Sequence, residues 1–378
     1  MPPFAEIRAW MFEAALPLWG SAGVDRARGG FYEELDLQGR PTDVAFKRTR
    51  VACRQIYAFS HGALLGWKEG MELSAYGYEH LTSKAWMGPD RGWARRLTAD
   101  GAVLDPSTDL YDLAFVLFAL AWRHKASGDR DPIARAHQLL DFLDASCRAG
   151  PGMGFLHEQA PGGWRWQNPH MHLLEAALAM YEACDDQRFL DLAREIVALF
   201  RRYFFDGRNM AEYFGPDLAR APGADGRIIE PGHQFEWAWI LSQYQRLAGD
   251  DTTDETRALM AFGEAHGVDH ATNVAYNQVQ DDGAPLDLGS RSWPNTERIK
   301  GHVALFERGE RASLAAIEGS ARLLLDRYLA VTPRGLWIDH FDASGRPLSN
   351  VAPASTLYHI FLAFAEVLRL EPQVIAAG

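Results

Sequence analysis

A repeat that recurs six times along the chain restricts its possible folds more than any other feature of the sequence. Each copy has a short strand-like run, a turn with glycine and a returning run, which predicts a hairpin. Measured at one apolar position per copy, successive copies are 62, 62, 56, 64 and 62 residues apart. A period this regular indicates one structural unit repeated throughout the chain. The marker positions are Phe31, Trp93, Phe155, Ala211, Ala275 and Trp337, and the hairpins are expected at 29–41, 91–104, 154–163, 209–226, 273–283 and 335–345.

Each step of the repeat has room for two helices. The helix that leaves each hairpin is apolar on most faces, which is typical of a buried helix. The other helix is more charged and amphipathic, as in 132–147, 188–203 and 311–329. This pattern predicts an all-α fold, an (α/α)6 barrel of six inner and six outer helices with short β-hairpins at the active-site end. The inner helices are predicted at 50–67, 110–125, 169–183, 233–247, 296–306 and 356–370.

Residues 1–378 are expected to form a single catalytic domain, because no stretch rich in Pro, Gly or Ser separates two halves. If the six hairpins lie at one end of the barrel, the residues that open the inner helices converge on one central cavity. Polar, titratable and aromatic residues are concentrated at those positions. They are Arg48, Arg50, Arg54, Asp109, Tyr111, Asp112, Asn168, His170, His172, His233, Glu236, Trp293, Glu297, Tyr358 and His359.

The fourth inner helix carries the clearest functional signal. His233 lies in its first turn and Glu236 follows three residues later, so both polar side chains share one face of a largely aromatic helix. A buried imidazole and carboxylate must be satisfied by each other, by a partner or by a ligand, because burial without one is costly. A core histidine bonded to a structural glutamate is the alternative interpretation.

Five segments of the chain resemble motifs of the N-acylglucosamine 2-epimerase superfamily, most closely its sugar isomerase members. They are 54–59, 168–176, 233–237, 293–297 and 358–359, and the resemblance runs over essentially the whole chain. It implies that His233 and His359 are the acid and base, and that Glu236 orients His233. It further implies that the sugar is surrounded by Arg54, Asn168, His172 and Trp293. No cofactor is expected.

Four further residues are candidates for binding substrate because they open inner helices at the same end of the barrel. They are Arg50, Tyr111, Asp112 and Glu297. The run 353–359 has no tryptophan ahead of the last histidine, whereas cellobiose epimerases carry one, so a monosaccharide is favoured. Lys47, Arg48 and Arg50 form a cationic cluster that fits a solvated helix start as well as a phosphate or sulfonate site.

The paired histidines suit proton transfer next to a sugar carbonyl. An imidazole with an ordinary pKa of about 6.5 can take or give a proton at neutral pH. We therefore expect an isomerase that interconverts D-mannose and D-fructose through a cis-enediol intermediate without a metal. His170 and His172, two residues apart on a helix, point to different faces, so no metal site is predicted.

Other reactions of a sugar isomerase or epimerase stay open, and so do two other classes of protein. On the same scaffold they are mannose 6-phosphate isomerisation and 2-epimerisation of mannose, glucose or N-acylglucosamine. A glycoside hydrolase could draw two carboxylates from Asp109, Asp112, Glu236 and Glu297, although the paired histidines argue against it. A carbohydrate-binding protein without turnover is the third class.

Composition narrows the choice of partners and location. The net charge of −12 argues against nucleic acid and anionic membranes as partners. Cys53, Cys147 and Cys184 have no metal-type spacing, so reduced thiols in a cytoplasmic protein are expected. Residues 1–19 read as an amphipathic helix, neither a signal peptide nor a membrane span. Apart from a monosaccharide substrate, the only partner that the sequence leaves open is a second copy of this chain in a homodimer.

Overall fold

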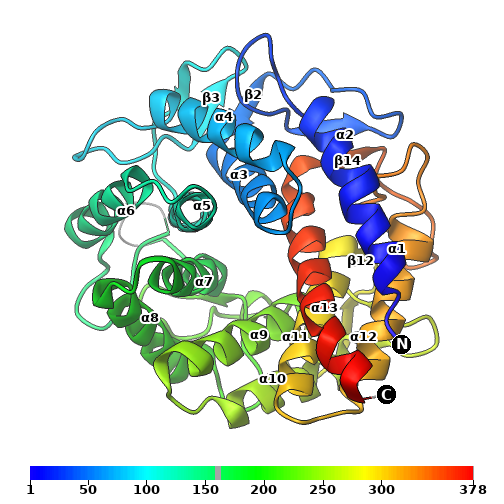
Figure 1. The fold of residues 1–378 in the computed structure, drawn as a ribbon. Coiled ribbons are helices and arrows are strands. Elements are labelled where there is room, and N and C mark those ends of the chain that lie inside the picture. The colour runs from blue at the N-terminus through cyan, green and yellow to red at the C-terminus, as the bar shows by residue number, and fades with distance from the viewer. Residues whose placement is uncertain (158–162, 378) are drawn as a thin grey trace.

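A computed structural model describes residues 1–157 and 163–377 of the chain. Figure 1 looks down a double ring of helices, in which an inner ring surrounds the axis. The predicted (α/α)6 barrel is confirmed. The inner helices are α3 (Thr49–Leu64), α5 (Leu110–Ser127), α7 (Gln167–Cys184), α9 (Pro231–Ala248), α11 (Ser292–Glu307) and α13 (Leu357–Ala377).

The outer ring alternates with the inner one along the chain. Its sixth member opens the chain and consists of α1 (Phe4–Ala9), the π-helical η1 (Trp10–Ala15) and α2 (Leu16–Ser21). The π turns η2 (Leu143–Cys147), η3 (Phe200–Phe204) and η5 (Leu324–Tyr328) extend three outer helices. The remaining outer helices are α4 (Glu69–Lys84), α6 (Asp131–Phe142), α8 (Gln187–Leu199), α10 (Thr253–His266) and α12 (Ser313–Leu323).

Burial explains why the two rings differ in composition. In α5 every residue from Leu113 to Ala121 is buried, because other helices surround this helix on all sides. In α8 the buried residues recur on one face and charged ones occupy the other, as expected for a helix that covers the ring. Asp109 caps α5 by accepting a hydrogen bond from the Tyr111 amide, and Gly128 ends it with φ +75°. The sequence thus indicates which helices belong to the inner ring and where such a helix begins and ends.

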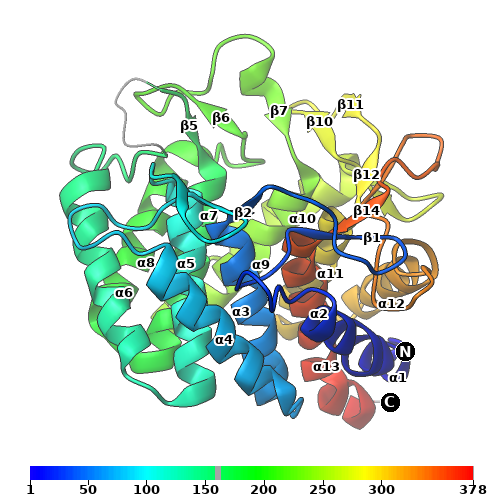
Figure 2. The ribbon, with the colours of Figure 1, turned by 90° about the horizontal axis from the view of Figure 1, so that it is seen from above.

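Short strands gather at one end of the barrel (Figure 2). They pair mainly between neighbouring repeats, whereas the sequence predicted a separate hairpin within each repeat. Pairing of β1 (Glu34–Asp36) with β14 (Val351–Pro353) joins the first repeat to the last and closes the ring. The other sheets are β2 (Phe46–Arg48) with β3 (Arg96–Thr98) and β4 (Val103–Asp105); β5 (Arg165–Trp166) with β6 (Tyr213–Phe214); β7 (Ile228–Ile229) with β10 (Gln278–Gln280) and β11 (Pro285–Asp287); β8 (Val268–Asp269) with β9 (Val274–Ala275); and β12 (Ser290–Arg291) with β13 (His340–Phe341). Two 3-10 turns, η4 (Asp225–Arg227) and η6 (Ala354–Thr356), precede β7 and α13.

The repeat seen in the sequence is a buried turn that follows each outer helix. In three repeats an inner-helix side chain accepts a hydrogen bond from a backbone amide of this turn. The acceptors are Nε2 of His170 for Phe155, Oε1 of Gln234 for Met210 and Oδ1 of Asn295 for Ala275. His170 is therefore a structural histidine, and burial lowers its pKa to about 3. Glu158 and Gly162 of the third predicted hairpin lie outside the described residues.

No helix in the described part of the chain is long and apolar enough to cross a membrane.

Candidate active site

A cavity of about 340 Å³ opens on the barrel axis, at the end where the strands gather. Side chains from near the starts of the inner helices form part of its wall, as the repeat predicted, and strands and loops at the same end form the rest. His233 and His359 both line it, and they come from α9 and α13. The other lining residues are Arg54, Tyr111, Trp166, Asn168, His172, Glu212, Tyr213, Glu230, Glu236, Arg291, Trp293, Asp339, Pro353, Ser355 and Thr356.

His359 is held as a neutral imidazole. Its Nδ1 lies 2.8 Å from Oε1 of Glu297, so Nδ1–H donates to this carboxylate and Nε2 keeps a free lone pair. Burial lowers the pKa of His359 well below its usual value, and the positive charges of Arg54 and Lys300 lower it further. A neutral imidazole with a fixed tautomer is equipped to accept a proton.

His233 is held in the opposite protonation state. Its Nδ1 lies 2.8 Å from Oε2 of Glu212 and 3.5 Å from Oε2 of Glu230. Burial alone would lower the pKa of His233, but the surrounding carboxylates, Glu212 first, raise it to about 9. At neutral pH this side chain is an imidazolium and a proton donor.

A chain of hydrogen bonds fixes the carboxylate that faces His233. Nε1 of Trp237 donates to Oε1 of Gln167 at 2.6 Å, and Nε2 of Gln167 donates to Oε2 of Glu212 at 2.8 Å. The Glu230 amide donates to the other oxygen of Glu212 at 3.2 Å. Glu212 is thereby held in one orientation against His233.

Trp293 lies between the two histidines. Its ring centre is 4.9 Å from that of His233 and 5.6 Å from that of His359. Gly232 allows this packing, because a Cβ there would stand 2.4 Å from Cζ3 of Trp293. The indole thus gives the cavity an apolar wall that connects the two titratable groups.

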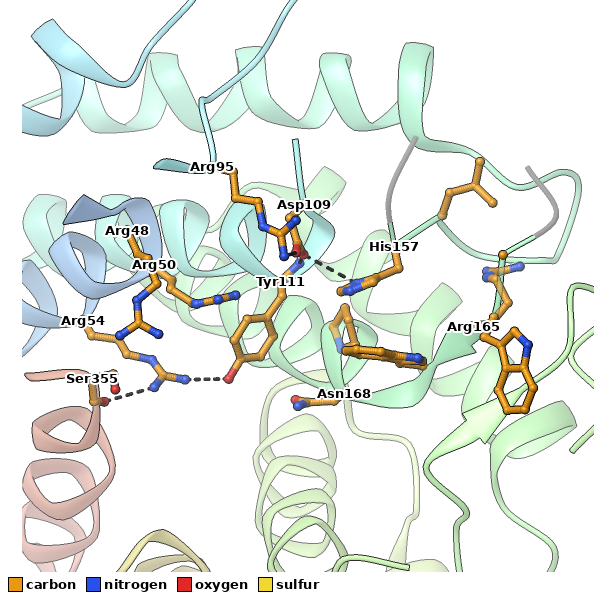
Figure 3. A pocket seen from close by; sticks show the side chains of 15 residues that line it. Arg48, Arg50, Arg54, Arg95, Asp109, Tyr111, His157, Arg165, Asn168 and Ser355 are labelled. Carbon is orange, nitrogen blue, oxygen red and sulfur yellow. Dashed lines mark hydrogen bonds and ion pairs between the residues drawn. The ribbon is translucent and has the colours of Figure 1, made fainter. Parts of the chain in front are cut away.

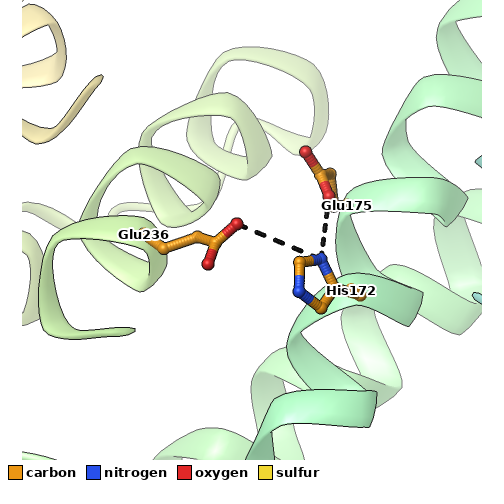
Figure 4. Close-up of side chains that lie close together, drawn as sticks. All are labelled: His172, Glu175 and Glu236. Atoms are coloured by element: carbon orange, nitrogen blue, oxygen red, sulfur yellow. Dashed lines mark hydrogen bonds and ion pairs between the residues drawn. The ribbon is translucent and has the colours of Figure 1, made fainter. Parts of the chain in front are cut away.

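Beneath the cavity lies a cluster of three buried carboxylates and one ammonium. Nζ of Lys300 is 2.6 Å from Oε2 of Glu297 and 3.7 Å from Oε1 of Glu236. Figure 4 shows Glu175 and Glu236 on either side of His172, whose Nδ1 is 3.1 Å from Glu175 and 4.0 Å from Glu236. The carboxylates outnumber the ammonium, so the cluster favours taking up a proton.

Glu236 is the member of the cluster best placed to hold that proton. Glu175 accepts hydrogen bonds from Tyr358 and His172, and Glu297 is paired with Lys300 and His359. Within the described structure, neither carboxylate oxygen of Glu236 has a hydrogen-bond partner. Burial raises the pKa of Glu236 well above its usual value, and the charge of Glu297 raises it further. Glu236 therefore faces the cavity as a neutral carboxylic acid.

The predicted contact between Glu236 and His233 is not formed, since Glu212 occupies Nδ1 of His233. The three-residue spacing does place Glu236 on the same helical face, but its carboxyl turns toward His172 and Lys300. Among the described residues, neither oxygen of Glu236 accepts a hydrogen bond from the ring of His233 or from that of His172. His233 is therefore paired with Glu212, and Glu236 makes no direct contact with it.

Most of the other expected binding residues line the cavity. Arg54 donates to the Tyr111 hydroxyl at 2.7 Å and to the Ser355 carbonyl at 3.0 Å. Asn168 also lines the cavity, and its buried Oδ1 has no hydrogen-bond partner within residues 1–157 and 163–377. Burial lowers the pKa of His172 to about 4, which leaves this ring neutral.

Asp112 and Glu297, which were expected to touch substrate, lie behind the cavity wall instead. Asp112 is buried, accepts a hydrogen bond from the Arg50 amide and lies 3.8 Å from Nε of Arg50. Burial raises its pKa to about 7. Glu297 is fully buried against His359 and Lys300. Both carboxyls support residues at the cavity rather than form its surface.

A second, larger cavity of about 650 Å³ adjoins the first and shares Arg54, Tyr111 and Asn168 with it. Figure 3 shows the side chains of Arg48, Arg50 and Arg54 on one side of this cavity and Arg165 on the other. Lys47 does not belong to it, because its Nζ is buried at 2.8 Å from Asp25. The cationic cluster predicted from the sequence is therefore divided between a buried ion pair and a cavity wall.

Three groups of side chains bring possible metal ligands within 4.8 Å of one another. They are His172, Glu175 and Glu236; Glu212, Glu230 and His233; and Glu236, Glu297 and His359. In the third group Lys300 already supplies a positive charge next to both carboxylates. In the first two, Nδ1 of His172 and Nδ1 of His233 are turned to their carboxylates. Each histidine in these groups is thus paired with a carboxylate, whereas the oxygens of Glu236 have no hydrogen-bond partner in the described structure.

The sequence did not point to four residues that shape the site. Glu212 lies in the fourth predicted hairpin, outside the inner helices, so helical spacing could not connect it with His233. Glu230 is the N-cap residue of α9, three residues before His233, so spacing could have found it. Glu175 and Lys300 lie three residues after His172 and Glu297, on α7 and α11. Glu175 and Lys300 could have been found by the same three-residue helical spacing that selected Glu236.

The chain matches the family model for N-acylglucosamine 2-epimerase over residues 30–363. It is 37% identical to a protein of Rhizobium meliloti named mannose-6-phosphate isomerase, covering 96% of each chain. It is 26% identical to a Thermobifida fusca protein named D-mannose isomerase, covering 92% of this chain and 95% of the other. In fold it resembles the solved cellobiose 2-epimerase of Spirochaeta thermophila, with a TM-score of 0.87, 23% identity, and 98% and 97% of the two chains covered.

Proposed function

The chain belongs to the N-acylglucosamine 2-epimerase family of sugar isomerases and epimerases, and we propose on this basis that it is an aldose-ketose isomerase. The proposed reaction interconverts a mannose-configured aldose and its fructose-configured ketose, with D-mannose and D-fructose as the simplest pair. The relatives named mannose-6-phosphate isomerase and D-mannose isomerase support this configuration. The observation that carries the proposal is that two histidines in one cavity have their pKa values shifted in opposite directions.

In the proposed mechanism the neutral His359 is the base. Its Nε2 takes the proton from C2 of the open-chain aldose, while the His233 imidazolium gives a proton to O1. The result is a cis-enediol. His233 then takes the proton from O2 and His359 returns its proton to C1, which yields the ketose with both histidines in their starting states.

The remaining residues would stabilise the charge that develops on the sugar oxygens. Arg54 provides a fixed positive charge at the cavity, and Glu236 offers the hydrogen of a neutral carboxylic acid. Trp293 would hold the sugar against its apolar face. No step in this scheme requires a metal ion, and Cys53, Cys147 and Cys184, which form no disulfide in the described structure, fit a cytoplasmic location.

Sugar 2-epimerisation is the second candidate, because the same two histidines could serve it. An imidazolium at His233 could deliver a proton to C2 on the face opposite His359, which would invert C2 instead of forming a ketose. Incubation of the protein with mannose in deuterated water, followed by NMR, separates the two candidates. We expect fructose; glucose would favour the epimerase, and unchanged mannose would argue against both.

A further inference from the structure

The second cavity concentrates positive charge in a protein whose net charge is −12. Five arginines line it in the described part of the chain, together with one carboxylate, that of Asp109. It adjoins the first cavity, the sugar cavity of the proposed function, and shares Arg54 and Tyr111 with it. What it can bind depends on how many of these charges are already cancelled by neighbouring carboxylates. The five are Arg48, Arg50, Arg54, Arg95 and Arg165.

Two of the arginines are paired with carboxylates. Nε of Arg48 lies 2.6 Å from Oε2 of Glu33, and the Arg48 amide donates to the other oxygen of this carboxylate. Arg95 lies 3.4 Å from Oδ2 of Asp109. These two guanidinium groups add little net charge to the cavity.

Two others have neutral hydrogen-bond partners. Arg54 donates to a hydroxyl and a backbone carbonyl, and Arg165 donates to the carbonyls of Met153 and Phe155. Both side chains are more than nine-tenths buried, and the Nε of each has no hydrogen-bond partner among the residues that the structure describes. Each leaves a positive charge without a carboxylate to balance it.

The charge of Arg50 is balanced less than those of Arg48 and Arg95 but more than those of Arg54 and Arg165. Its Nε is 3.8 Å from Oδ1 of Asp112, which is too long for a hydrogen bond. Burial raises the pKa of Asp112 to about 7, so this carboxyl is only partly ionised at neutral pH. The guanidinium of Arg50 stands 5.3 Å from the ring centre of Tyr111, and that of Arg54 stands 5.7 Å from it. The two cations thus flank one tyrosine where the cavities meet.

We propose that this second cavity binds an anionic group, such as a phosphate ester or a carboxylate, carried by the sugar at the end remote from C1 and C2. The proposal rests on the isomerase function proposed above, since the sugar cavity must hold C1 and C2 next to the histidines. Arg50 and Arg54 would contact the anion where the cavities meet, and Arg165 on the opposite side would add to the positive potential. A neutral hexose would leave these charges unbalanced.

The test compares kcat/KM for mannose 6-phosphate with kcat/KM for mannose. We expect the phosphorylated sugar to be favoured by about tenfold or more, since one charge-assisted hydrogen bond contributes that much. The single variants Arg50→Gln and Arg165→Gln should each lower this ratio by about tenfold. The double variant Arg48→Gln with Glu33→Gln removes a cation and its partner together and should leave the ratio near the wild-type value.

Inorganic phosphate provides a second measurement that needs no variant. It should compete with mannose 6-phosphate at concentrations where potassium chloride of equal ionic strength does not. Mannuronate, which carries a carboxylate at C6, shows whether the site selects phosphate or any anion. Equal kcat/KM for mannose and both anionic sugars, with no inhibition by phosphate, would overturn the proposal while leaving the isomerase intact. No turnover of any of the three sugars would count against the proposed function itself.

Discussion

Nδ1 of His233 lies 2.8 Å from Oε2 of Glu212, a residue 21 positions earlier in the chain. The contact joins the strand-rich end of the barrel to the first turn of α9, and Glu212 is the first of the carboxylates that raise the pKa of His233 to about 9. His359 makes a contact of the same length to Glu297, yet burial and nearby cations keep its pKa low. Similar hydrogen bonds thus leave one histidine charged and the other neutral, because their wider surroundings differ.

The first prediction concerns the pH dependence of catalysis. Because His233 must carry a proton and its pKa is raised to about 9, kcat/KM should hold through neutral pH and fall above about pH 9. Glu212→Gln removes the largest charge that raises this pKa, so the alkaline limb should move to lower pH. A pH profile of kcat/KM for both proteins measures the shift. If the alkaline limb of the Glu212→Gln profile stays at the wild-type pH, a group other than His233 titrates in that range.

The second prediction separates the two glutamates that open α9 and α11. If Glu236 is a neutral acid, Glu236→Gln keeps a hydrogen-bond donor and should lower kcat by about tenfold or less. Glu297→Gln removes a charge that holds His359 and balances Lys300, so a loss of about a hundredfold is expected. Infrared spectra should show a protonated carboxyl band in the wild type that Glu236→Gln removes. A larger loss of kcat in Glu236→Gln than in Glu297→Gln would mean that Glu236 carries the negative charge.

The third prediction is about stability. Lys300 is fully buried between Glu297 and Glu236. Lys300→Met would leave buried carboxylates without their cation, which costs about 3–5 kcal/mol of unfolding free energy. Urea denaturation measures this loss. Arg246→Met, which breaks an exposed ion pair with Glu182, serves as the control and should cost less than about 1 kcal/mol. Similar midpoints for both variants would show that the buried cluster contributes little.

The fourth prediction is that catalysis needs no metal. In the proposed mechanism Arg54 and the two histidines already provide the positive charge and the proton transfer that the reaction requires. Treatment with EDTA followed by gel filtration should leave kcat within about twofold of its starting value. Loss of activity that zinc or manganese restores would instead point to one of the three groups of ligand-type residues at the cavity.

The fold could be predicted from the sequence because its signals are local and repeated. The period between Phe31 and Trp337, and the apolar helices such as α5, recur in every repeat, so an error in one copy is corrected by the others. The pairing of strands between neighbours, for example β1 with β14, could not be read from the sequence. It depends on the ring closing and brings together residues from opposite ends of the chain.

The candidate site was predictable only where its residues lie near the start of an inner helix. His233, His359, Arg54 and Trp293 open inner helices and all reach the cavity. Charge states depend on contacts between separate elements, such as Glu212 ahead of β6 with His233 on α9, and no spacing within one helix predicts these. This explains why the sequence selected Glu236 as the partner of His233 although its carboxyl lies elsewhere.

The most direct test of the account is the rate at which His359→Ala removes the C2 proton of mannose. In deuterated water, NMR follows both the loss of the C2 hydrogen signal and the appearance of product, and circular dichroism confirms that the variant is folded. If His359 is the base, both rates should fall by about a hundredfold or more relative to the wild type. A folded His359→Ala protein that exchanges the C2 hydrogen and forms product at nearly the wild-type rate would contradict the account.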